Sequence, residues 1–490
     1  MGIPPIPAEQ EPAQRCRRPI VSIGAAVLLA AMLAVISLAG ADGEEAEARP
    51  NLVVIMTDDQ TTESLRVMET VQDEIGSEGA RFDRAYVNFP LCCPSRATFL
   101  TGQYAHNHGV LDNEPPAGGF ERFEDLHGED NLATWLDGAG YRTALVGKYF
   151  NGYADDGVGF VPPGWDEWYG AVAPAQHVYD YGLNENGEVV HYGGDVADFK
   201  QDVLTERAVD IIEESAGDGA PLFLDLAYTA PHAAGASPQP PGNCKVSPKP
   251  APRHAHAFDD EPLPRPPSFD EANVRDKPFG VRKRPPLGPG SVERMTRRYR
   301  CTLESLQSVD EGAGEVLDAL RRTGELDDTI VVFTSDNGFF YGEHRITGGK
   351  LRHYEEATRV PLLIRGPGIE PGTEVTSPVI NADLAPTLLD AAGVEPPREL
   401  DGVSLLPVAA GEAAGADRDL LLESRHYAGV HTKRWSYVEH GAGKSRELYD
   451  LAADPFELHN LIGRAAYADV AAELGGRLDE LRDCAGSGCR

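Results

Sequence analysis

The hydrophobic pattern of the chain alternates between short apolar runs and longer amphipathic segments. The first run, NLVVIM at 51–56, is apolar at consecutive positions, which is typical of a strand buried on both faces of a parallel sheet. Similar runs follow at 143–150, 221–228, 329–338 and 360–368. The amphipathic segments predict helices at 61–79, 131–140, 197–216 and 295–323. This alternation predicts an α/β fold whose mixed, mostly parallel sheet is sandwiched by helices.

Two later stretches depart from this pattern. Residues 233–295 contain PQPPGN and PLPRPP, so they predict an irregular, proline-rich insertion in a main domain of 48–395. Residues 396–490 carry short strand-like pieces and predict a smaller C-terminal α+β subdomain. The end of the insertion and the segment after it are basic, which fits a solvated surface or a positive lip over an anion-binding pocket. The basic residues are Arg275, Lys277, Arg282, Lys283, Arg284, Arg294, Arg297, Arg298 and Arg300.

The N-terminal segment predicts export. Three arginines precede an apolar run at 20–39, and the small residues at 39–41 offer a cleavage site. Residues 1–41 therefore read as a signal peptide or, if uncleaved, as a membrane anchor, and the body is secreted or extracytoplasmic in both cases. The formal net charge of -34 favours a soluble protein and excludes nucleic acid as a partner, because a phosphate polymer would be repelled.

Export changes the interpretation of the cysteines. In an oxidising compartment structural cysteines tend to pair. Cys484 and Cys489 are close enough in sequence to close a small loop, and Cys244 and Cys301 could bracket a long excursion. An adjacent pair of cysteines then remains for another purpose.

That pair, Cys92 and Cys93, lies in the stretch FPLCCPSRATFLTG. Pro94 suits the first turn of a helix, which would place one of the two thiols at the positive helix end with Arg96 one turn away. A nucleophile there could attack or hold an anion. Buried thiols or disulfide partners are the alternative.

Polar side chains directly follow several predicted strands. In parallel sheets the carboxyl ends of strands meet at one edge, so these residues are expected to converge. Adjacent buried carboxylates repel one another unless a cation lies between them, and oxygen ligands suit Ca²⁺ or Mg²⁺ better than zinc. Each motif alone also fits a solvated turn. The residues are Asp58, Asp59, Lys148, His232, Asp336 and Asn337.

The stretch from Cys92 to Gly102 resembles the signature of the type I sulfatases, C-x-P-S-R followed by an apolar pair and T-G. Other segments stand in the order of that family, and GKYFNGY together with the paired cysteines resembles its glucosamine 6-sulfatase branch, which includes sulfatases of heparan-type glycans. These segments are VVIMTDDQ, TGQYAHNHGV, GKYFNGY, TAPH, TSDNGFFYGEH, GGKLRHYEEATRVPLLIRGPG, ADLAPTLLDAAG and ELYDLAADPFELHNL.

The resemblance implies an alkaline-phosphatase-like fold and a sulfatase catalytic domain at 48–395. It also implies that the formylglycine-generating enzyme converts Cys92 to formylglycine, while Cys93 fills a variable position. Arg96, Lys148 and Lys350 match residues that bind the formylglycine diol or the sulfate, and His232 matches a histidine near the leaving group. The implied ligands of the divalent cation, Ca²⁺ or possible Mg²⁺, are Asp58, Asp59, Cys92, Asp336 and Asn337.

One position departs from the family pattern. Many arylsulfatases have a histidine where this chain has Phe150, and Asn151 is a weak candidate to replace it. The HNHG stretch at 106–109 predicts a helix-exit turn with satisfied histidines, although His108 could line the pocket.

Together these features predict an exported sulfatase that hydrolyses a sulfate ester on a glucosamine 6-sulfate-like carbohydrate. Its partner would be a sulfated small molecule or glycan. One alternative is a phosphonate monoester or phosphodiester hydrolase on the same scaffold. A catalytically silent glycan-binding homologue is a second, and the intact metal and anion-binding residues argue against it.

Overall fold

The computed structural model describes residues 49–490 except 155–158, 235–243, 245–246, 413–417 and 442. The predicted signal peptide or anchor at 1–41 lies outside the described residues. Within the described ranges, no helix has both the length and the apolar character needed to cross a membrane.

A ten-stranded mixed sheet forms the centre of the fold, in the order β12-β2-β11-β9-β1-β8-β4-β5-β6-β7. Its five middle strands are parallel: β9 (Thr329–Ser335), β1 (Asn51–Thr57), β8 (Leu222–Ala227), β4 (Arg142–Gly147) and β5 (Glu167–Ala171). Antiparallel pairs join both flanks to this centre, β11 to β9 on one side and β6 to β5 on the other. The flanking strands are β11 (Leu362–Arg365), β2 (Ala80–Phe82), β12 (Thr373–Val375), β6 (Tyr181–Glu185) and β7 (Glu188–Tyr192).

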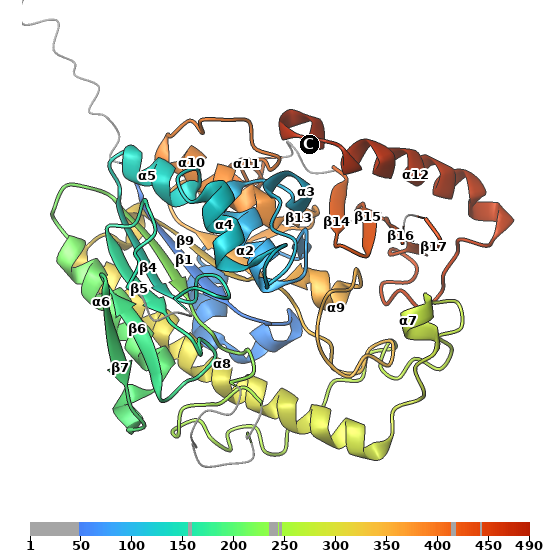
Figure 1. Cartoon of the computed structure of the whole chain (residues 1–490), viewed down its shortest axis with the longest axis horizontal. Helices are drawn as coiled ribbons and strands as arrows, with labels where there is room; N and C mark the ends of the chain where they lie inside the picture. Colours follow the sequence, from blue (N-terminus) through green and yellow to red (C-terminus); the bar gives the residue numbers. More distant parts are fainter. Residues whose placement is uncertain (1–48, 155–158, 235–243, 245–246, 413–417, 442) are drawn as a thin grey trace, which may run out of the picture. The chain divides into compact units, whose positions relative to one another are not determined.

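Helices cover both faces of this sheet, as Figure 1 shows. Alternate residues of β1 explain why: Leu52 and Val54 pack into one core, whereas Val53 and Ile55 pack into the other. The first core receives α2 (Cys92–Thr101), α4 (Gly119–His127), α5 (Leu132–Gly138) and α10 (Leu384–Ala392). The second receives α6 (Lys200–Ser215) and α8 (Pro289–Thr323). The α/β sandwich expected from the consecutive apolar runs is therefore confirmed.

Two predicted helices differ from the structure. The segment 61–79 is not one helix: it forms a 3-10 helix at Glu63–Val67 and a π-helix at Val71–Gly76. The Asp310 carboxylate on α8 accepts from the backbone N–H groups of Thr70 and Val71, so this tertiary contact fixes the break. Helix α8 begins at Pro289 rather than at 295, because proline suits the first turn of a helix.

The insertion at 233–295 is irregular in its described part. It contains the short α7 (Phe279–Arg282) and the start of α8, with turns between them. A disulfide between Cys244 and Cys301 joins it to α8, and a second links Cys484 to Cys489. Both pairings are among those that the sequence allowed but did not decide.

A four-stranded antiparallel sheet forms the C-terminal subdomain. Its strands are β14 (Leu420–Glu423), β15 (Tyr427–His431), β16 (Trp435–His440) and β17 (Ser445–Asp450). Helix α12 (Ala468–Arg482) packs its leucines into the core of this sheet. The other strands and α-helices of the described residues are short: β3 (Ala85–Tyr86), β10 (Arg359–Val360), β13 (Val379–Ile380), α3 (Ala105–His108), α9 (Glu355–Thr358) and α11 (Leu406–Ala409).

Candidate active site

The two adjacent cysteines begin helix α2, but their side chains have different surroundings. Cys92 is the first residue of the helix, and its thiol points at Asp58 Oδ1 at 3.5 Å. Cys93 lies in the hydrophobic core, where its sulfur accepts from the Asn151 backbone N–H at 3.2 Å. Both thiols are buried and free, so the disulfide alternative is wrong. Only Cys92 faces polar chemistry.

Carboxylates from two neighbouring strands surround Cys92. Asp58 and Asp59 follow β1, and Asp336 and Asn337 follow β9, which is paired with β1 in parallel register. Ligand atoms of the three aspartates and the Cys92 sulfur all lie within 4.8 Å of one another. Asp59 has a φ of 70°, and its backbone N–H donates to Asp336 Oδ1 at 3.3 Å. The expected convergence at the carboxyl ends of the strands is present.

Three cationic side chains enclose these carboxylates. Arg96 Nε and Nη2 each lie 3.0 Å from Asp336 Oδ2, and its Nη1 donates to the Lys148 carbonyl at 2.7 Å. Lys148 pairs with Asp58 Oδ2. Lys350 pairs with Asp59 Oδ1 and also lies 3.0 Å from the Cys92 sulfur. Every predicted anion-binding cation therefore reaches the same cluster.

Burial and charge set the protonation of this cluster. Burial and the Asp58 carboxylate raise the pKa of Cys92 to about 11, against the opposing effect of Lys148 and Lys350. Burial also opposes ionisation of Asp58, but Lys148 and the other cations hold its pKa below the ordinary value. For Asp336, burial and Asp58 raise the pKa. The cluster thus holds a neutral thiol beside ionised carboxylate.

The donor set fits a hard divalent cation. Asn337 Nδ2 donates to Asp59 Oδ1 at 2.6 Å, whereas the buried Asn337 Oδ1 has no hydrogen-bond partner among the described residues. That unpaired amide oxygen and the aspartate oxygens are ligands of the kind that Ca²⁺ and Mg²⁺ prefer. The three aspartates balance the three cations in charge, so a bound divalent ion would leave a net positive site that suits an anion.

His232 lies on the open side of the cluster, after β8. Its Nε2 is 3.8 Å from Asp59 Oδ2, and a quarter of its side chain is exposed. Its Nδ1 donates to the Ala233 carbonyl at 3.0 Å, because a carbonyl can only accept. This bond fixes the ring and directs Nε2 toward the cluster.

The sequence left the roles of Phe150, Asn151 and His108 open. In the structure these residues lie away from the cluster around Cys92 or pack in the core. Phe150 stacks on Phe123 with ring centroids 4.2 Å apart, so no polar group replaces the family histidine there. The backbone N–H of Asn151 contacts Cys93, and its buried Oδ1 has no hydrogen-bond partner in the described structure. His108 is fully buried, its Nδ1 accepts from the backbone N–H two residues on, and its Nε2 lies 3.1 Å from Thr98 Oγ1. It therefore does not line the pocket.

One charged residue near the cluster was missed from the sequence. Asp225 lies within β8, in the apolar run PLFLDLAY, and its Oδ1 is buried without a hydrogen-bond partner among the described residues. Burial raises its pKa to about 7, against the effect of Arg96. The only signal in the sequence was a single carboxylate inside a strand that is buried on both faces.

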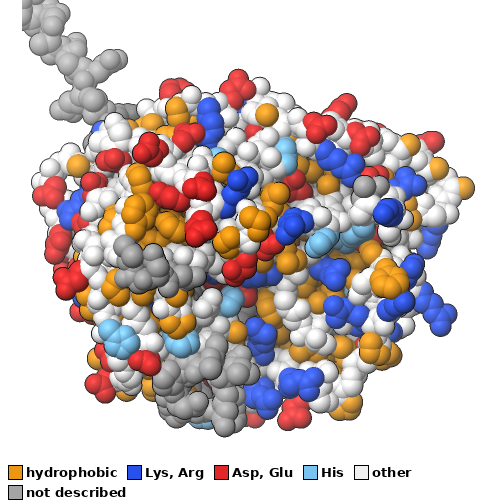
Figure 2. Space-filling view, viewed as in Figure 1, with side chains coloured by type: hydrophobic (Ala, Val, Ile, Leu, Met, Phe, Trp, Pro, Cys, Tyr) orange, Lys and Arg blue, Asp and Glu red, His pale blue; other side chains and the backbone are white. Residues whose placement is uncertain are grey.

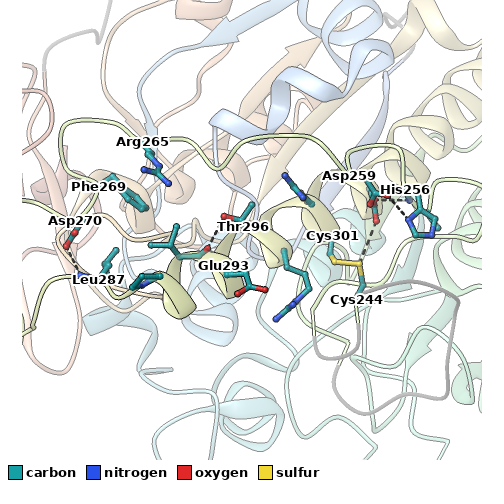
Figure 3. A pocket seen from close by; sticks show the side chains of 16 residues that line it. Cys244, His256, Asp259, Arg265, Phe269, Asp270, Leu287, Glu293, Thr296 and Cys301 are labelled. Carbon is teal, nitrogen blue, oxygen red and sulfur yellow. Dashed lines mark hydrogen bonds and ion pairs between the residues drawn. A yellow bond between two sulfur atoms is a disulfide. The ribbon is translucent and has the colours of Figure 1, made fainter.

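A large cavity in the described structure is lined by other residues than the cluster around Cys92. Its volume is about 690 Å³, and Figure 3 shows Arg265, Glu293, Thr296 and the Cys244–Cys301 disulfide on its walls. None of the predicted catalytic residues lines it. The chemistry of the side chains, rather than cavity size, therefore identifies the candidate active site.

Basic side chains gather on one face, in the right-hand part of Figure 2. Arg275, Arg282 and Lys283 are exposed near α7, whereas Lys277 is buried and donates to the Glu457 carbonyl at 2.7 Å. Arg298 lies over the ring of Phe339, two residues after Asn337. Both interpretations of the basic segment, a solvated surface or an anion-attracting lip, remain compatible with this arrangement.

Comparison with known proteins identifies the family. Residues 50–394 match the family model described as Sulfatase, and residues 342–484 match N-sulphoglucosamine sulphohydrolase, C-terminal. The N-acetylglucosamine-6-sulfatase of Homo sapiens is 31% identical over 491 residues, which cover 90% of this chain and 86% of that protein.

Two further similarities extend this result. The extracellular sulfatase SULF-1 homolog of Drosophila melanogaster is 36% identical over 367 residues, which cover 74% of this chain; the chain spans 31% of the length of that relative. A solved protein in complex with its substrate, D-glucosamine-2-N,6-O-disulfate, is 27% identical with a TM-score of 0.72, covering 89% of this chain and 97% of that one. The chain belongs to the sulfatase family, with an N-sulphoglucosamine sulphohydrolase-type C-terminal region.

Proposed function

We propose that this protein hydrolyses a sulfate ester on a glucosamine-containing glycan, using a formylglycine made from Cys92. The observation that carries the proposal is the position of Cys92. Its sulfur lies 3.5 Å from Asp58 and 3.0 Å from Lys350, at the start of a helix and among the carboxylates that could hold a cation. Cys93 contacts none of these groups in the described structure.

The protonation of Cys92 supports its chemical conversion. A thiol with a pKa near 11 is a poor nucleophile at neutral pH, since the thiolate is the reactive form. An aldehyde at the same position would hydrate to a geminal diol. One hydroxyl of the diol would lose its proton and attack sulfur as the bond from sulfur to the sugar oxygen breaks. The other hydroxyl would then lose its proton, re-form the carbonyl and release sulfate by cleavage of the C–O bond.

Residues of the chain supply charge and protons along this path. Lys350 lies beside Cys92, and Lys148 and Arg96 pair with the carboxylates around it, so these three residues would supply fixed positive charge near the sulfate. His232 Nε2 is on the open side, where the imidazolium form of the ring, protonated at both nitrogens, could donate a proton to the departing sugar oxygen. A Ca²⁺ ion held by the oxygen ligands would favour ionisation of the diol and withdraw charge from the sulfate.

The proposed glycan class has three supports. Relatives are named N-acetylglucosamine-6-sulfatases, and a solved neighbour binds a glucosamine disulfate. The exposed arginines and lysine near α7 would attract a sulfated chain to a protein whose net charge is -34. A 6-O-sulfated glucosamine is therefore the proposed substrate.

Export and maturation belong to the same proposal. The two disulfides and the leader-like segment at 1–41 support an oxidising, extracytoplasmic location. A relative is named an extracellular sulfatase. A formylglycine-generating enzyme would act on the Cys92 segment during maturation.

The test is sulfate release from a matched panel. It contains 6-O-, N- and 2-O-sulfated glucosamine saccharides, an aryl sulfate and a phosphodiester, with Cys92→Ala as the control. We expect release from the 6-O-sulfated sugar at a kcat/KM far above that for the other substrates. A clear preference for the phosphodiester would replace the proposal with phosphodiester hydrolysis, and release only from the N- or 2-O-sulfated sugar would overturn the 6-O assignment.

A further inference from the structure

A second cluster of potential metal ligands lies outside the catalytic constellation. His344 and Glu356 belong to the segment after β9, and Glu457 follows β17 in the C-terminal subdomain. One ligand atom from each of these three residues lies within 4.8 Å of the other two. None of them belongs to the Asp58–Asp59–Asp336 group around Cys92.

The histidine of this cluster is oriented like a metal ligand. His344 is completely buried, and its Nδ1 lies 2.8 Å from Glu271 Oε2, so Nδ1 donates to that carboxylate. Its Nε2 then carries the free lone pair. This Nε2 has no hydrogen-bond partner among the described residues, and its nearest charged neighbour is Glu356 Oε2 at 3.9 Å. A carboxylate that holds one ring nitrogen while the other faces further ligands is the usual arrangement around a metal-bound histidine.

The carboxylates opposite His344 are incompletely neutralised. Glu356 Oε1 accepts from the Ser268 hydroxyl at 3.0 Å, but Glu356 Oε2 is buried without a hydrogen-bond partner in the described structure. Glu457 accepts from the Glu355 backbone N–H at 3.1 Å. No lysine or arginine of the described residues forms an ion pair with either carboxylate, whereas nearby Glu355 pairs with Arg359. Two buried carboxylates this close repel each other unless a proton or a cation lies between them.

We infer that His344, Glu356 and Glu457 bind a divalent transition-metal ion of the zinc type, separate from the catalytic cation. One imidazole nitrogen and two carboxylate oxygens form the mixed ligand set that Zn²⁺ accepts, whereas Ca²⁺ takes oxygen ligands only. The two orphaned atoms, His344 Nε2 and Glu356 Oε2, face each other and supply the lone pairs. The ion would neutralise the paired carboxylates.

A competing histidine cluster differs in its carboxylate, although both ring nitrogens of its buried His353 also lack a hydrogen-bond partner among the described residues. His353, His440 and Glu447 also approach one another, but Glu447 Oε1 lies 2.7 Å from His440 Nε2. Glu447 Oε2 accepts from the hydroxyls of Tyr354 and Tyr449. The protein itself therefore satisfies this carboxylate, and His440 provides a matched control for zinc binding.

The site would brace the segment that carries Lys350. His344 and Glu356 lie on either side of Lys350 in the chain, and Glu457 comes from the C-terminal subdomain. One ion bound to all three would close the segment 344–356 and fasten it to that subdomain. Because Lys350 contacts Asp59 and Cys92, this brace would support the catalytic cluster from outside.

A cavity of about 520 Å³ reaches one residue of the cluster. Glu356 lines it together with Glu343, Glu355, Pro455 and Phe456, among others, and about a fifth of the Glu356 side chain is exposed. His344 and Glu457 are buried and do not line this cavity, so Glu356 is the most exposed member of the cluster.

The test is zinc binding to the full-length protein with the catalytic cation site saturated by Ca²⁺. Protein is stripped with EDTA, returned to excess Ca²⁺ and titrated with ZnCl₂ in a calorimeter. We expect one equivalent of Zn²⁺ to bind with micromolar or tighter affinity. Glu356→Gln and His344→Gln should weaken binding by about tenfold or more, and His440→Gln should not change it. Zinc should also raise the Tm of the wild type and the His440→Gln protein, but not that of Glu356→Gln.

Three results would overturn the inference. They are absence of zinc binding in the Ca²⁺-saturated wild type, unchanged affinity in Glu356→Gln, or loss of binding in His440→Gln. Glu356→Gln preserves the shape of the side chain, so this variant alone can test the inference if His344→Gln does not fold. Circular dichroism and Ca²⁺ binding of each variant verify that the fold and the catalytic cluster are intact.

Discussion

The buried pair of Arg96 and Asp336 offers a quantitative test of the active-site electrostatics. Arg96 places two nitrogens 3.0 Å from one oxygen of Asp336, and both side chains are almost fully buried. In Arg96→Gln the Asp336 carboxylate stays buried but loses its partner. Removal of one member of a buried pair costs about 3–5 kcal/mol, because the remaining charge is uncompensated. We expect the free energy of unfolding to fall by that amount.

A double-mutant cycle separates this cost from simple loss of packing. In Arg96→Gln/Asp336→Asn both charges are absent, so the double variant should be more stable than the sum of the single losses by about 2–3 kcal/mol. The assay is equilibrium urea unfolding followed by tryptophan fluorescence, with a chelator present so that metal binding does not contribute. Arg96→Gln should also lower kcat/KM by about a hundredfold or more.

Two outcomes would refute this reasoning. The first is a stability loss below about 1 kcal/mol in Arg96→Gln, the level of an ordinary surface contact. The second is strict additivity in the cycle, which would mean that the two side chains do not interact.

Three further predictions test other parts of the account. Cys92→Ala should abolish sulfate release and Cys93→Ala should retain it, because only Cys92 faces the polar cluster. The reverse pattern in the release assay would show that Cys93 is the residue that becomes the nucleophile. Removal of divalent cations with EGTA should abolish sulfate release, and added Ca²⁺ should restore it, since the oxygen ligands need a cation; full activity after chelation would remove the metal from the mechanism. Burial lowers the pKa of His431 from 6.5 to about 3. Below pH 6.5 the unfolded chain therefore binds a proton that the folded protein excludes. As a result, the free energy of unfolding falls toward pH 3 by up to about 1.4 kcal/mol per pH unit. His431→Asn should remove this part of the slope in urea unfolding, and equal slopes in the two proteins would contradict the assignment.

The central sheet was predictable because its signal is local. Consecutive apolar residues in β1 and β9 indicate strands buried on both faces, and the polar residues after each strand have to meet at one edge. The same logic places Asp58, Asp59, Asp336 and Asn337 together from the sequence alone. Spacing and compartment made the two disulfides possible, but the pairing itself is seen only in the structure.

Other features depend on contacts that sequence periodicity does not contain. The break between the two short helices after β1 results from Asp310 on α8, more than two hundred residues away in the chain. The second ligand cluster joins His344 and Glu356 to Glu457 from another subdomain. Asp225 is a single polar residue in an apolar run, so the sequence did not indicate that it lies near Arg96.

The most direct test of the central claim is the mass of the peptide that contains Cys92 in an active preparation. We expect that Cys92 carries the aldehyde of formylglycine or its hydrate, that Cys93 in the same peptide remains a thiol, and that sulfate release scales with the converted fraction. An active preparation in which Cys92 is an unmodified thiol throughout, or in which Cys93 carries the modification, would contradict it.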